Sequence, residues 1–393
     1  MGSRFAIFGP AHLGGINSFC ARLTAGLAPH GIELHRIGVL DRKPLHGSPE
    51  GTLINRADLG DRQLSEALYQ TVMEGGYDGA IFNILVEPYT ANLARYLPSG
   101  MAKILVLHGI TTGMYSWARA IRDWLHHTVV IAPRMRSDLT GRWGFDPGRM
   151  SLIPHGIGAP FGGGDRAASE GPLRVLVASR LADADKGCLW IPGILAAVRD
   201  LPVELTVAGD GADRSRLEHR LAAAPCKVTF TGAVPQQVLA DLYRGHDVLL
   251  LPSRTEGFAL SLLEAMASGC VPVASRIKGV TDAAVTDGRD GYLFAIGDTA
   301  TAAACLRRLA GDRQLLRRLS AAAMETAATR FALGDQMAAY AELLAGLGRS
   351  LPPAAPPERM EKWTMASGFK PRLRSHVPAP LRIWLRTAAE RLR

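Results

Sequence analysis

Apolar segments of strand length alternate with segments of helical periodicity along most of this 393-residue chain. The strand-like segments are rich in Val, Ile and Leu, which is typical of strands buried on both faces of a parallel sheet. They cover residues 4–8, 79–85, 103–107 and 128–132 in the first half, and 173–178, 204–208, 227–231, 248–251 and 271–274 in the second. This alternation predicts an α/β protein with right-handed crossovers and two parallel sheets, each covered by helices on both faces.

The chain is too long for a single ordinary core, and a glycine-rich segment indicates where it divides. Three consecutive glycines open a run of small and polar residues that is typical of a flexible boundary. We predict a first domain over residues 1–161, a linker over 162–172 and a second domain over 173–349. Two doubly wound domains facing each other across this hinge would place the carboxyl edges of both sheets on one cleft.

Residues 350–393 form a tail, in which a proline-rich stretch at 351–357 ends the preceding helix. Beyond this linker the sequence predicts a basic amphipathic helix over 380–393. Its apolar face is formed by Leu381, Trp384, Leu385, Ala388 and Leu392, and its basic face by Arg382, Arg386 and Arg393. The sequence leaves two roles open for this helix: contact with an anionic membrane surface, or packing on the protein itself.

The formal net charge of +9 does not indicate a nucleic-acid-binding protein. The stretch 351–393 carries nine Lys and Arg against three Asp and Glu, and so accounts for +6 of this charge. The rest of the chain is close to neutral, whereas binding along a duplex needs a broad basic face. We therefore expect no nucleic-acid partner.

The cysteines and the N-terminus favour a cytoplasmic protein. No apolar run approaches the length that crosses a bilayer, and the first strand-like segment starts at Arg4, so we expect no cleavable signal. The five cysteines show no metal-ligand spacing and are typical of buried residues in a reducing compartment. They are Cys20, Cys188, Cys226, Cys270 and Cys305.

The segment from Pro252 to Gly269 carries the strongest functional signal. It follows an apolar strand and contains a turn up to Gly257 and a short helix over 260–267. A strand, a turn and a helix N-terminus in this order form an anion site at the carboxyl edge of a sheet. Glu256 lies in the turn, and Glu264 lies about 7 Å along the helix from its start. Two carboxylates that bind hydroxyls would then bracket a diphosphate, which predicts a nucleotide-sugar site.

Arg180 and Lys186 follow the strand at 173–178. Two cations at the end of a strand would neutralise the charge that develops on a diphosphate leaving group. The alternative is a solvated loop in which Asp183 and Asp185 pair with these cations. The two acids also form a D-x-D sequence, which is the metal motif of a different sugar-transferase architecture. Because the adjacent cations would compete with a metal ion, we interpret this match as chance and expect no metal.

Glycine-rich turns and one histidine complete the set of candidates. Gly15 follows the first strand, and Gly209 and Gly211 follow the strand at 204–208, where their lack of a side chain lets a ligand approach backbone N–H groups. Val234 lies in the turn after 227–231 and would flank a base. His108 follows the strand at 103–107 and is either catalytic or a hydrogen-bonded structural residue.

Taken together, these segments resemble the retaining glycosyltransferases of family four. The matching pieces are Gly14-Gly15-Ile16, His108-Gly109, Ser179-Arg180-Leu181 with Lys186-Gly187, Ala208-Gly209-Asp210-Gly211, Phe230-Thr231-Gly232 and the block from Pro252 to Gly269. They occur in the family's order over roughly residues 3–348. Ala259 and Lys278 replace glycines that are usual in the family, and His155 replaces a usual asparagine.

The resemblance implies the GT-B fold: two Rossmann-like domains, of which the first binds the acceptor and the second binds the nucleotide-sugar. It implies that Arg180 and Lys186 bind the donor diphosphate. Glu264 would bind ribose hydroxyls, Glu256 would hold hydroxyls of the transferred sugar, and His108 would help position that sugar. Backbone amides of Phe258, Ala259, Leu260 and Ser261 would support the phosphates. Such enzymes retain the anomeric configuration, are metal-independent and need no cofactor, since the nucleotide-sugar is the donor substrate.

The leading hypothesis is therefore a hexosyltransferase-type enzyme that moves a sugar to a glycan or lipid-linked acceptor in cell-surface polysaccharide or glycoconjugate synthesis. The tail would hold it at the cytoplasmic face of the membrane. Two alternatives stay open: a GT-B nucleotide-sugar epimerase, and a non-catalytic nucleotide-sugar-binding subunit. A phosphorylase would need a cofactor-bearing lysine context that the sequence lacks. The donor base, the sugar and the acceptor are not determined by the sequence.

Overall fold

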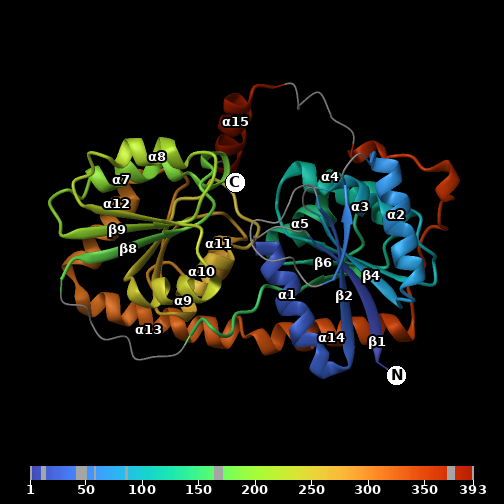
Figure 1. Ribbon diagram of the computed structural model, residues 1–393. Helices are drawn as coiled ribbons and strands as arrows, with labels where there is room; N and C mark the ends of the chain where they lie inside the picture. Colours follow the sequence, from blue (N-terminus) through green and yellow to red (C-terminus); the bar gives the residue numbers. More distant parts are fainter. Residues whose placement is uncertain are drawn as a thin grey trace. The chain divides into compact units, whose positions relative to one another are not determined.

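A computed structural model describes residues 2–9, 15–40, 51–56, 59–84, 87–162, 171–369 and 377–391. The chain forms two compact units, each built around one sheet (Figure 1). The first unit comprises Met1–Pro154 and Gly334–Arg374, and the second comprises His155–Leu333 and Ser375–Arg393. All neighbouring strands in both sheets are parallel, as the sequence predicts.

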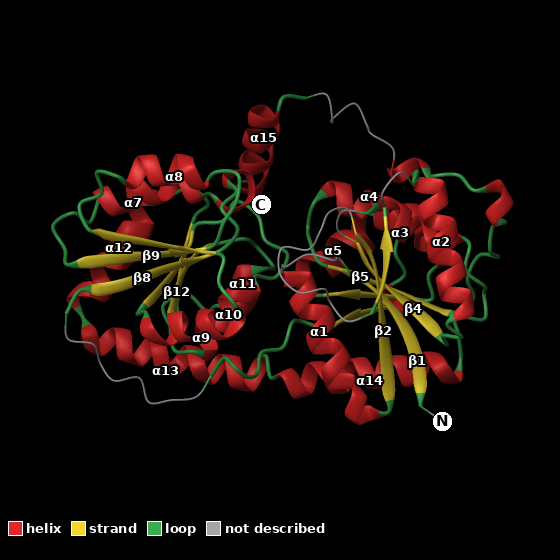
Figure 2. Cartoon of the chain, viewed as in Figure 1, coloured by secondary structure: helices red, strands yellow, loops and turns green. Residues whose placement is uncertain are grey.

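The first unit has a seven-stranded sheet in the order β3-β2-β1-β4-β5-β6-β7. Its strands are β1 (Ser3–Phe8), β2 (Ile32–Leu40), β3 (Thr52–Asn55), β4 (Gly79–Ile84), β5 (Ala102–Leu107), β6 (His127–Val130) and β7 (Met150–Leu152). Its helices are α1 (Gly15–Leu27), α2 (Asp61–Glu74), α3 (Pro88–Asn92), α4 (Thr112–Ile121), α5 (Pro133–Arg142) and α14 (Leu333–Arg349). Helices α2, α3 and α4 lie on one face of the sheet, and α1 and α14 lie on the other (Figure 2).

The second unit has a six-stranded sheet in the order β10-β9-β8-β11-β12-β13. Its strands are β8 (Leu173–Ala178), β9 (Val203–Ala208), β10 (Lys227–Gly232), β11 (Val248–Leu251), β12 (Val271–Ser275) and β13 (Tyr292–Phe294). Its helices are α6 (Asp183–Lys186), α7 (Ile191–Ala196), α8 (Arg214–Leu221), α9 (Gln236–Gly245), α10 (Leu260–Ala267), α11 (Thr281–Ala284), α12 (Thr299–Gly311), α13 (Arg313–Arg330) and α15 (Ala379–Arg391). Helices α7 and α8 lie on one face and α9 and α10 on the other.

Both sheets have a topological switch point. In the second unit β8 lies between β9 and β11, and in the first unit β1 lies between β2 and β4. Connections leave a switch point toward opposite faces of the sheet, which opens a crevice at the carboxyl ends of the two central strands. The central strands are mostly apolar, and all six residues of β5, including Lys103, are buried. The loops after β8 and β11 are therefore brought together at the carboxyl edge of the second sheet.

All nine predicted strands are present, with ends that differ by at most two residues. The four strands that the sequence did not predict are β2, β3, β7 and β13. Strand β2 alternates apolar and polar residues at its start, β3 is an edge strand with no buried residue, and β7 and β13 have only three residues each. Such strands lack the continuous apolar run that identifies a strand covered on both faces.

The division between the units differs from the predicted boundaries at 161/162 and 349/350. Two contacts within the second unit lie where the chain enters and leaves it: Ile157 N–H donates to the Phe331 carbonyl at 2.7 Å, and Leu333 N–H donates to the Ile157 carbonyl at 3.1 Å. From Gly334 onward, α14 belongs to the first unit, because its buried side chains pack there. The Tyr340 ring, for example, lies 6.1 Å from that of Phe19 in α1. Residues 163–170 of the predicted linker lie outside the described residues.

The proline-rich stretch after α14 is bound to the first unit. Arg95 and Glu358 form an ion pair at 2.7 Å, the Trp124 indole donates to the Pro356 carbonyl, and Ala355 N–H donates to the Asp123 carbonyl. The predicted tail helix is present as α15, and residues 392–393 lie outside the described part of the chain. Since α15 is grouped with the second unit, the predicted tail is divided between the two units.

Helix α14 provides a test of this division. Tyr340→Ala removes a fully buried aromatic ring and should lower the free energy of unfolding of the first unit by about 3 kcal/mol or more. Glu342→Ala, an exposed position on the same helix, should change it by less than about 0.5 kcal/mol. Hydrogen exchange by mass spectrometry should locate the lost protection in α1 and the first sheet. Loss confined to α12 and α13 would contradict the assignment of α14 to the first unit.

Candidate active site

The loops after β8 and β9 pack against each other through their backbones. Leu181 N–H donates to the Asp210 carbonyl at 2.8 Å, and Asp213 N–H donates to the Leu181 carbonyl at 2.9 Å. Gly209 and Gly211 have φ values of 144° and 156°, and a Cβ at either position would clash with the carbonyl oxygen of Ser179 or Leu181. The sequence therefore needs glycine at both positions so that the two loops can approach.

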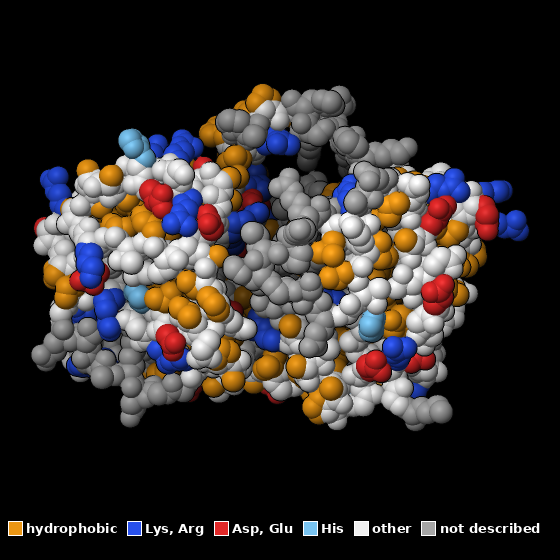
Figure 3. Space-filling view, viewed as in Figure 1, with side chains coloured by type: hydrophobic (Ala, Val, Ile, Leu, Met, Phe, Trp, Pro, Cys, Tyr) orange, Lys and Arg blue, Asp and Glu red, His pale blue; other side chains and the backbone are white. Residues whose placement is uncertain are grey.

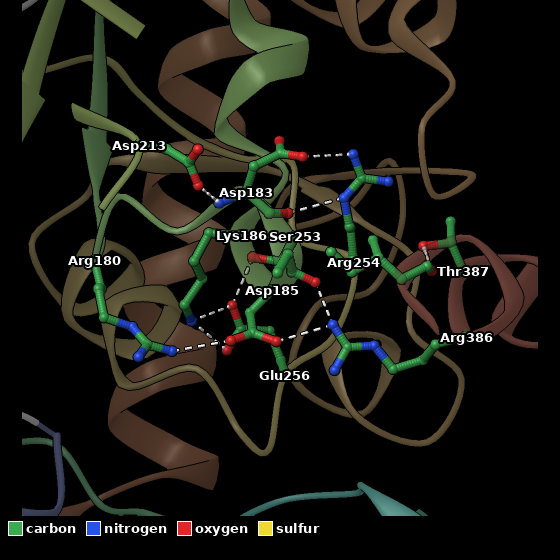
Figure 4. Close-up of polar contacts among 12 residues, drawn as sticks. Arg180, Asp183, Asp185, Lys186, Asp213, Ser253, Arg254, Glu256, Arg386 and Thr387 are labelled. Atoms are coloured by element: carbon green, nitrogen blue, oxygen red, sulfur yellow. Dashed lines mark hydrogen bonds and ion pairs between the residues drawn. The ribbon is translucent and has the colours of Figure 1, made fainter. Parts of the chain in front are cut away.

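Lys186 and Glu256 are the central pair of the candidate site (Figure 4). Lys186 ends α6, and its Nζ lies 2.7 and 2.9 Å from the two carboxylate oxygens of Glu256 in the loop after β11. The Ser253 hydroxyl donates to Glu256 Oε1 at 2.6 Å. The Glu256 side chain is only 6% exposed, against 22% for Lys186. A carboxylate buried to this degree requires such compensation, because an unpaired one would cost several kcal/mol.

Arg180 joins this cluster through Asp185. A guanidinium nitrogen of Arg180 donates to Asp185 Oδ2 at 3.0 Å, and the Arg180 side chain is 66% exposed. Backbone N–H groups of Arg254 and Thr255 donate to the Asp185 carbonyl, which ties α6 to the loop after β11. The structure thus brings Arg180, Lys186 and Glu256 together at the switch point of the second sheet, where Figure 4 shows them.

The two acids of the D-x-D sequence both have basic partners. Asp183 accepts from the Arg254 guanidinium at 2.9 Å and from Leu189 N–H at 2.9 Å, and the Arg254 guanidinium stacks on the Trp190 ring 3.8 Å from its centroid. Asp185 accepts hydrogen bonds from Arg180 and from Arg386 of α15. The salt-bridged loop that the sequence offered as an alternative is thus present only in part, since Asp185 pairs with Arg180 but Asp183 pairs with Arg254.

Helix α10 starts beside this cluster, and no side chain caps its N-terminus. Ala259 is its N-cap residue, and Leu260 and Ser261 form its first turn, with half-exposed side chains. Phe258 is buried, and its ring lies 5.6 Å from that of Phe331. The backbone N–H groups of a first helical turn lack partners within the helix and favour an anion. Val234 lies, half-buried, in the turn between β10 and α9.

Glu264 is hydrogen-bonded to a tyrosine of the neighbouring helix. It is buried on α10, and the Tyr243 hydroxyl of α9 donates to its Oε2 at 3.3 Å. Burial, with a contribution from the Glu264 carboxylate, raises the pKa of Tyr243 well above its ordinary value. This hydroxyl therefore stays protonated and donates to Glu264. The predicted role of Glu264 in binding ribose stays a prediction.

The switch point of the first sheet carries a neutral histidine. His108 Nε2 lies 2.8 Å from Asn83 Oδ1, at the end of β4, and its ring packs edge-on against Phe19 with centroids 4.8 Å apart. Asn83 Nδ2 donates to the Phe8 carbonyl at 2.6 Å, so its Oδ1 accepts from His108 Nε2–H and Nδ1 carries the ring's lone pair. Burial lowers the pKa of His108 to about 3. Gly15 is the first residue of α1; Gly14 lies outside the described residues.

Sequence reasoning missed two residues that contact the cluster formed by Arg180, Asp185, Lys186 and Glu256. Ser253 lies within the strongest predicted block, and its spacing of three residues from Glu256 was a usable signal. Arg386 comes from the tail helix, where it was predicted only as part of a basic face. Nothing in the local sequence indicates that this helix lies against the loop after β8.

A family model described as Glycosyl transferases group 1 matches residues 172–312. The sulfoquinovosyl transferase SQD2 of Arabidopsis thaliana is 35% identical over 136 residues, which cover 34% of this chain and 26% of that protein. The chain spans only about a quarter to half the length of the curated relatives it matches.

Two solved structures are similar over most of the chain. Sucrose-phosphate synthase from Thermosynechococcus elongatus has a TM-score of 0.74 at 20% identity, and Anabaena HepE in complex with UDP-glucose has a TM-score of 0.71 at 17% identity. Each similarity covers 88% of this chain and 100% of the other. The fold is therefore GT-B, as the sequence predicts. The match to the group 1 glycosyl transferases lies within the second unit.

Gly209 offers a test of the close approach between the two loops. Gly209→Ala should lower the free energy of unfolding of the second unit by roughly 2–4 kcal/mol, because a Cβ meets a backbone oxygen at a left-handed φ. Gly245→Ala at the end of α9 is the matched control. A Cβ there meets nothing within 4 Å, so that variant should unfold like the wild type or slightly later. Equal denaturation midpoints for both variants would contradict the steric argument.

Proposed function

We propose that this protein is a retaining glycosyltransferase that moves a sugar from a nucleotide-sugar donor to a glycan or lipid-linked acceptor. The observation that carries the proposal is the Lys186–Glu256 pair with Arg180 beside it, at the switch point of the second sheet. Such a crevice is where ligands bind in open α/β sheets. The site combines cations for a diphosphate with a carboxylate for sugar hydroxyls, and a helix N-terminus adjoins it.

The reaction follows from the charges of these groups. When the donor binds, Arg180 and Lys186 exchange their carboxylate partners for phosphate oxygens, which releases Glu256 to accept hydrogen bonds from the sugar. As the bond between the sugar's anomeric carbon and the phosphate oxygen breaks, its electron pair stays on the diphosphate, where both cations stabilise it. The acceptor hydroxyl attacks the anomeric carbon from the same face, and its proton passes to the departing phosphate oxygen.

His108 has a positioning role in this proposal. By the resemblance to family four, His108 would help to position the transferred sugar, and its ring is held by Asn83. The first unit would bind the acceptor and the second unit the donor, as the resemblance to family four implies.

Glu256→Gln tests whether the site catalyses transfer or only binds a nucleotide-sugar. The amide keeps the size of the side chain and releases Lys186, so binding of UDP, GDP or ADP should be unchanged or tighter. The rate of transfer or hydrolysis of the matching nucleotide-sugar should fall on the order of 100-fold, because the sugar is no longer held in the reactive geometry. Steady-state kinetics and calorimetric titration measure the two quantities.

The control is Asp200→Asn, which removes a carboxylate from an exposed ion pair with Arg307 elsewhere in the second unit. That variant should keep the wild-type rate within about twofold. Nucleotide binding without turnover in the wild type would favour the non-catalytic subunit, and an epimerised donor without transfer would favour the epimerase.

The exposed face of α15 supports contact with an anionic membrane, where a lipid-linked acceptor would lie. Among the described residues, Leu381, Trp384 and Leu385 are large apolar side chains with 48%, 64% and 50% exposure, and hydrophobic side chains are visible over this helix in Figure 3. Thr387 is buried, and Arg386 donates to Asp185 of the second unit. The helix thus packs on the second unit by its polar side. Exposed apolar and aromatic residues in a tail of net charge +6 suit the interface of an anionic bilayer. No helix that the structure describes is both long and apolar enough to span a bilayer.

Vesicle binding tests this surface. The double variant Trp384→Ser and Leu385→Ser should reduce co-sedimentation with vesicles of phosphatidylglycerol and phosphatidylcholine by about tenfold or more, because two large apolar side chains are lost from the interface. Val238→Ser, which removes an apolar side chain of 43% exposure from α9, should bind vesicles like the wild type. Equal binding by all three proteins would rule out α15 as the membrane contact.

A further inference from the structure

The tail helix contributes a third cation to the candidate donor site. The Arg386 guanidinium of α15 donates to Asp185 Oδ1 at 2.9 Å and to the Ala184 carbonyl (Figure 4). Arg391, one and a half turns further along, donates from Nε to the Ile296 carbonyl at 2.7 Å. These contacts, with the buried Thr387, hold α15 on the second unit beside the loop after β8. We infer that Arg386 is a positioning residue that keeps Arg180 available to the donor diphosphate.

Asp185 is the residue through which Arg386 acts. Its two carboxylate oxygens are divided between two arginines: Oδ2 accepts from Arg180 at 3.0 Å and Oδ1 accepts from Arg386 at 2.9 Å. Its backbone is fixed, because its carbonyl accepts from Arg254 N–H and Thr255 N–H. The backbone position of Asp185 therefore does not depend on α15. What α15 decides is whether Arg180 shares this carboxylate or holds it alone.

Sharing the carboxylate weakens its hold on Arg180. Without Arg386, both oxygens of Asp185 could accept hydrogen bonds from Arg180. A planar guanidinium binds a carboxylate more strongly through two parallel hydrogen bonds than through a single hydrogen bond. That pair would compete with the phosphates for Arg180. With Arg386 in place, Asp185 keeps a positive partner after Arg180 turns to the donor, so no uncompensated carboxylate remains next to the diphosphate.

The charge balance of the cluster leads to the same conclusion. Arg180, Lys186 and Arg386 face Asp185 and Glu256, which gives a net charge of +1 from three cations and two carboxylates. Removal of Arg386 makes the cluster neutral before the negatively charged donor arrives. Both effects weaken donor binding, and neither alters the groups that act on the sugar. The inference rests on the proposed donor site and extends it to the tail helix.

A double-mutant cycle on the full-length chain tests the inference. The variants are Arg386→Ala, Asp185→Asn and the two combined, with Arg386→Lys as the conservative variant and Arg382→Ala, exposed on the same helix, as the control. The ligand is UDP, GDP or ADP, whichever the wild type binds most tightly. Dissociation constants come from calorimetric titration, and donor KM and kcat are measured separately.

We expect Arg386→Ala to raise the dissociation constant and the donor KM about fivefold, with kcat within about twofold of the wild type. Arg386→Lys should recover at least half of the lost affinity, and Arg382→Ala should bind like the wild type. In the Asp185→Asn background, the loss of affinity caused by Arg386→Ala should be clearly smaller than in the wild type, because the carboxylate through which Arg386 acts on Arg180 is gone and only the loss of its own charge remains.

Three results would overturn the inference: wild-type affinity in Arg386→Ala, an equal loss in Arg382→Ala, or an undiminished loss in the Asp185→Asn background. A drop in kcat and melting temperature with unchanged KM would show a structural role for α15 instead. Failure of the proposed function is distinguishable, because the wild type would then bind none of the three nucleotides.

Discussion

The compensation of one buried carboxylate holds the candidate site together. Glu256 is almost fully withdrawn from solvent, and its charge is balanced by a lysine that ends α6 and by a serine three residues earlier in its own loop. Because an uncompensated charge at this depth would be costly, the loops after β8 and β11 cannot separate without a replacement partner. A bound diphosphate with a sugar would be such a replacement, since it offers anions to the lysine and hydroxyls to the glutamate.

The two sheets share one strand order around their switch points but differ in the chemistry placed there. The second unit gathers charged groups, with Arg180, Lys186 and Glu256 within a few ångströms of their partners. The first unit presents a neutral histidine whose tautomer is fixed by Asn83. One topology can serve both purposes because it determines only where loops meet, and the side chains on those loops determine what is bound.

Much of this arrangement could be predicted from the sequence, and the exceptions have physical reasons. Continuous apolar runs located the central strands, and the helix over 260–267 is present with the predicted bounds, because both signals are local. Edge strands such as β3 carry half-exposed residues and gave no such signal. The return of α14 to the first unit and the contact between Arg386 and Asp185 depend on packing between distant segments. No spacing along the chain encodes them.

The path of the chain has a practical consequence for anyone who wishes to produce the units one at a time. The polypeptide leaves the first unit after Pro154 and returns to it at Gly334, so a cut at either point leaves one unit incomplete. A fragment beginning at His155 would carry α14 without α1, and its Met337 and Tyr340 side chains, buried in the intact protein, would face water. Isolation of the second unit therefore requires the excision of 334–374 and a new junction to α15.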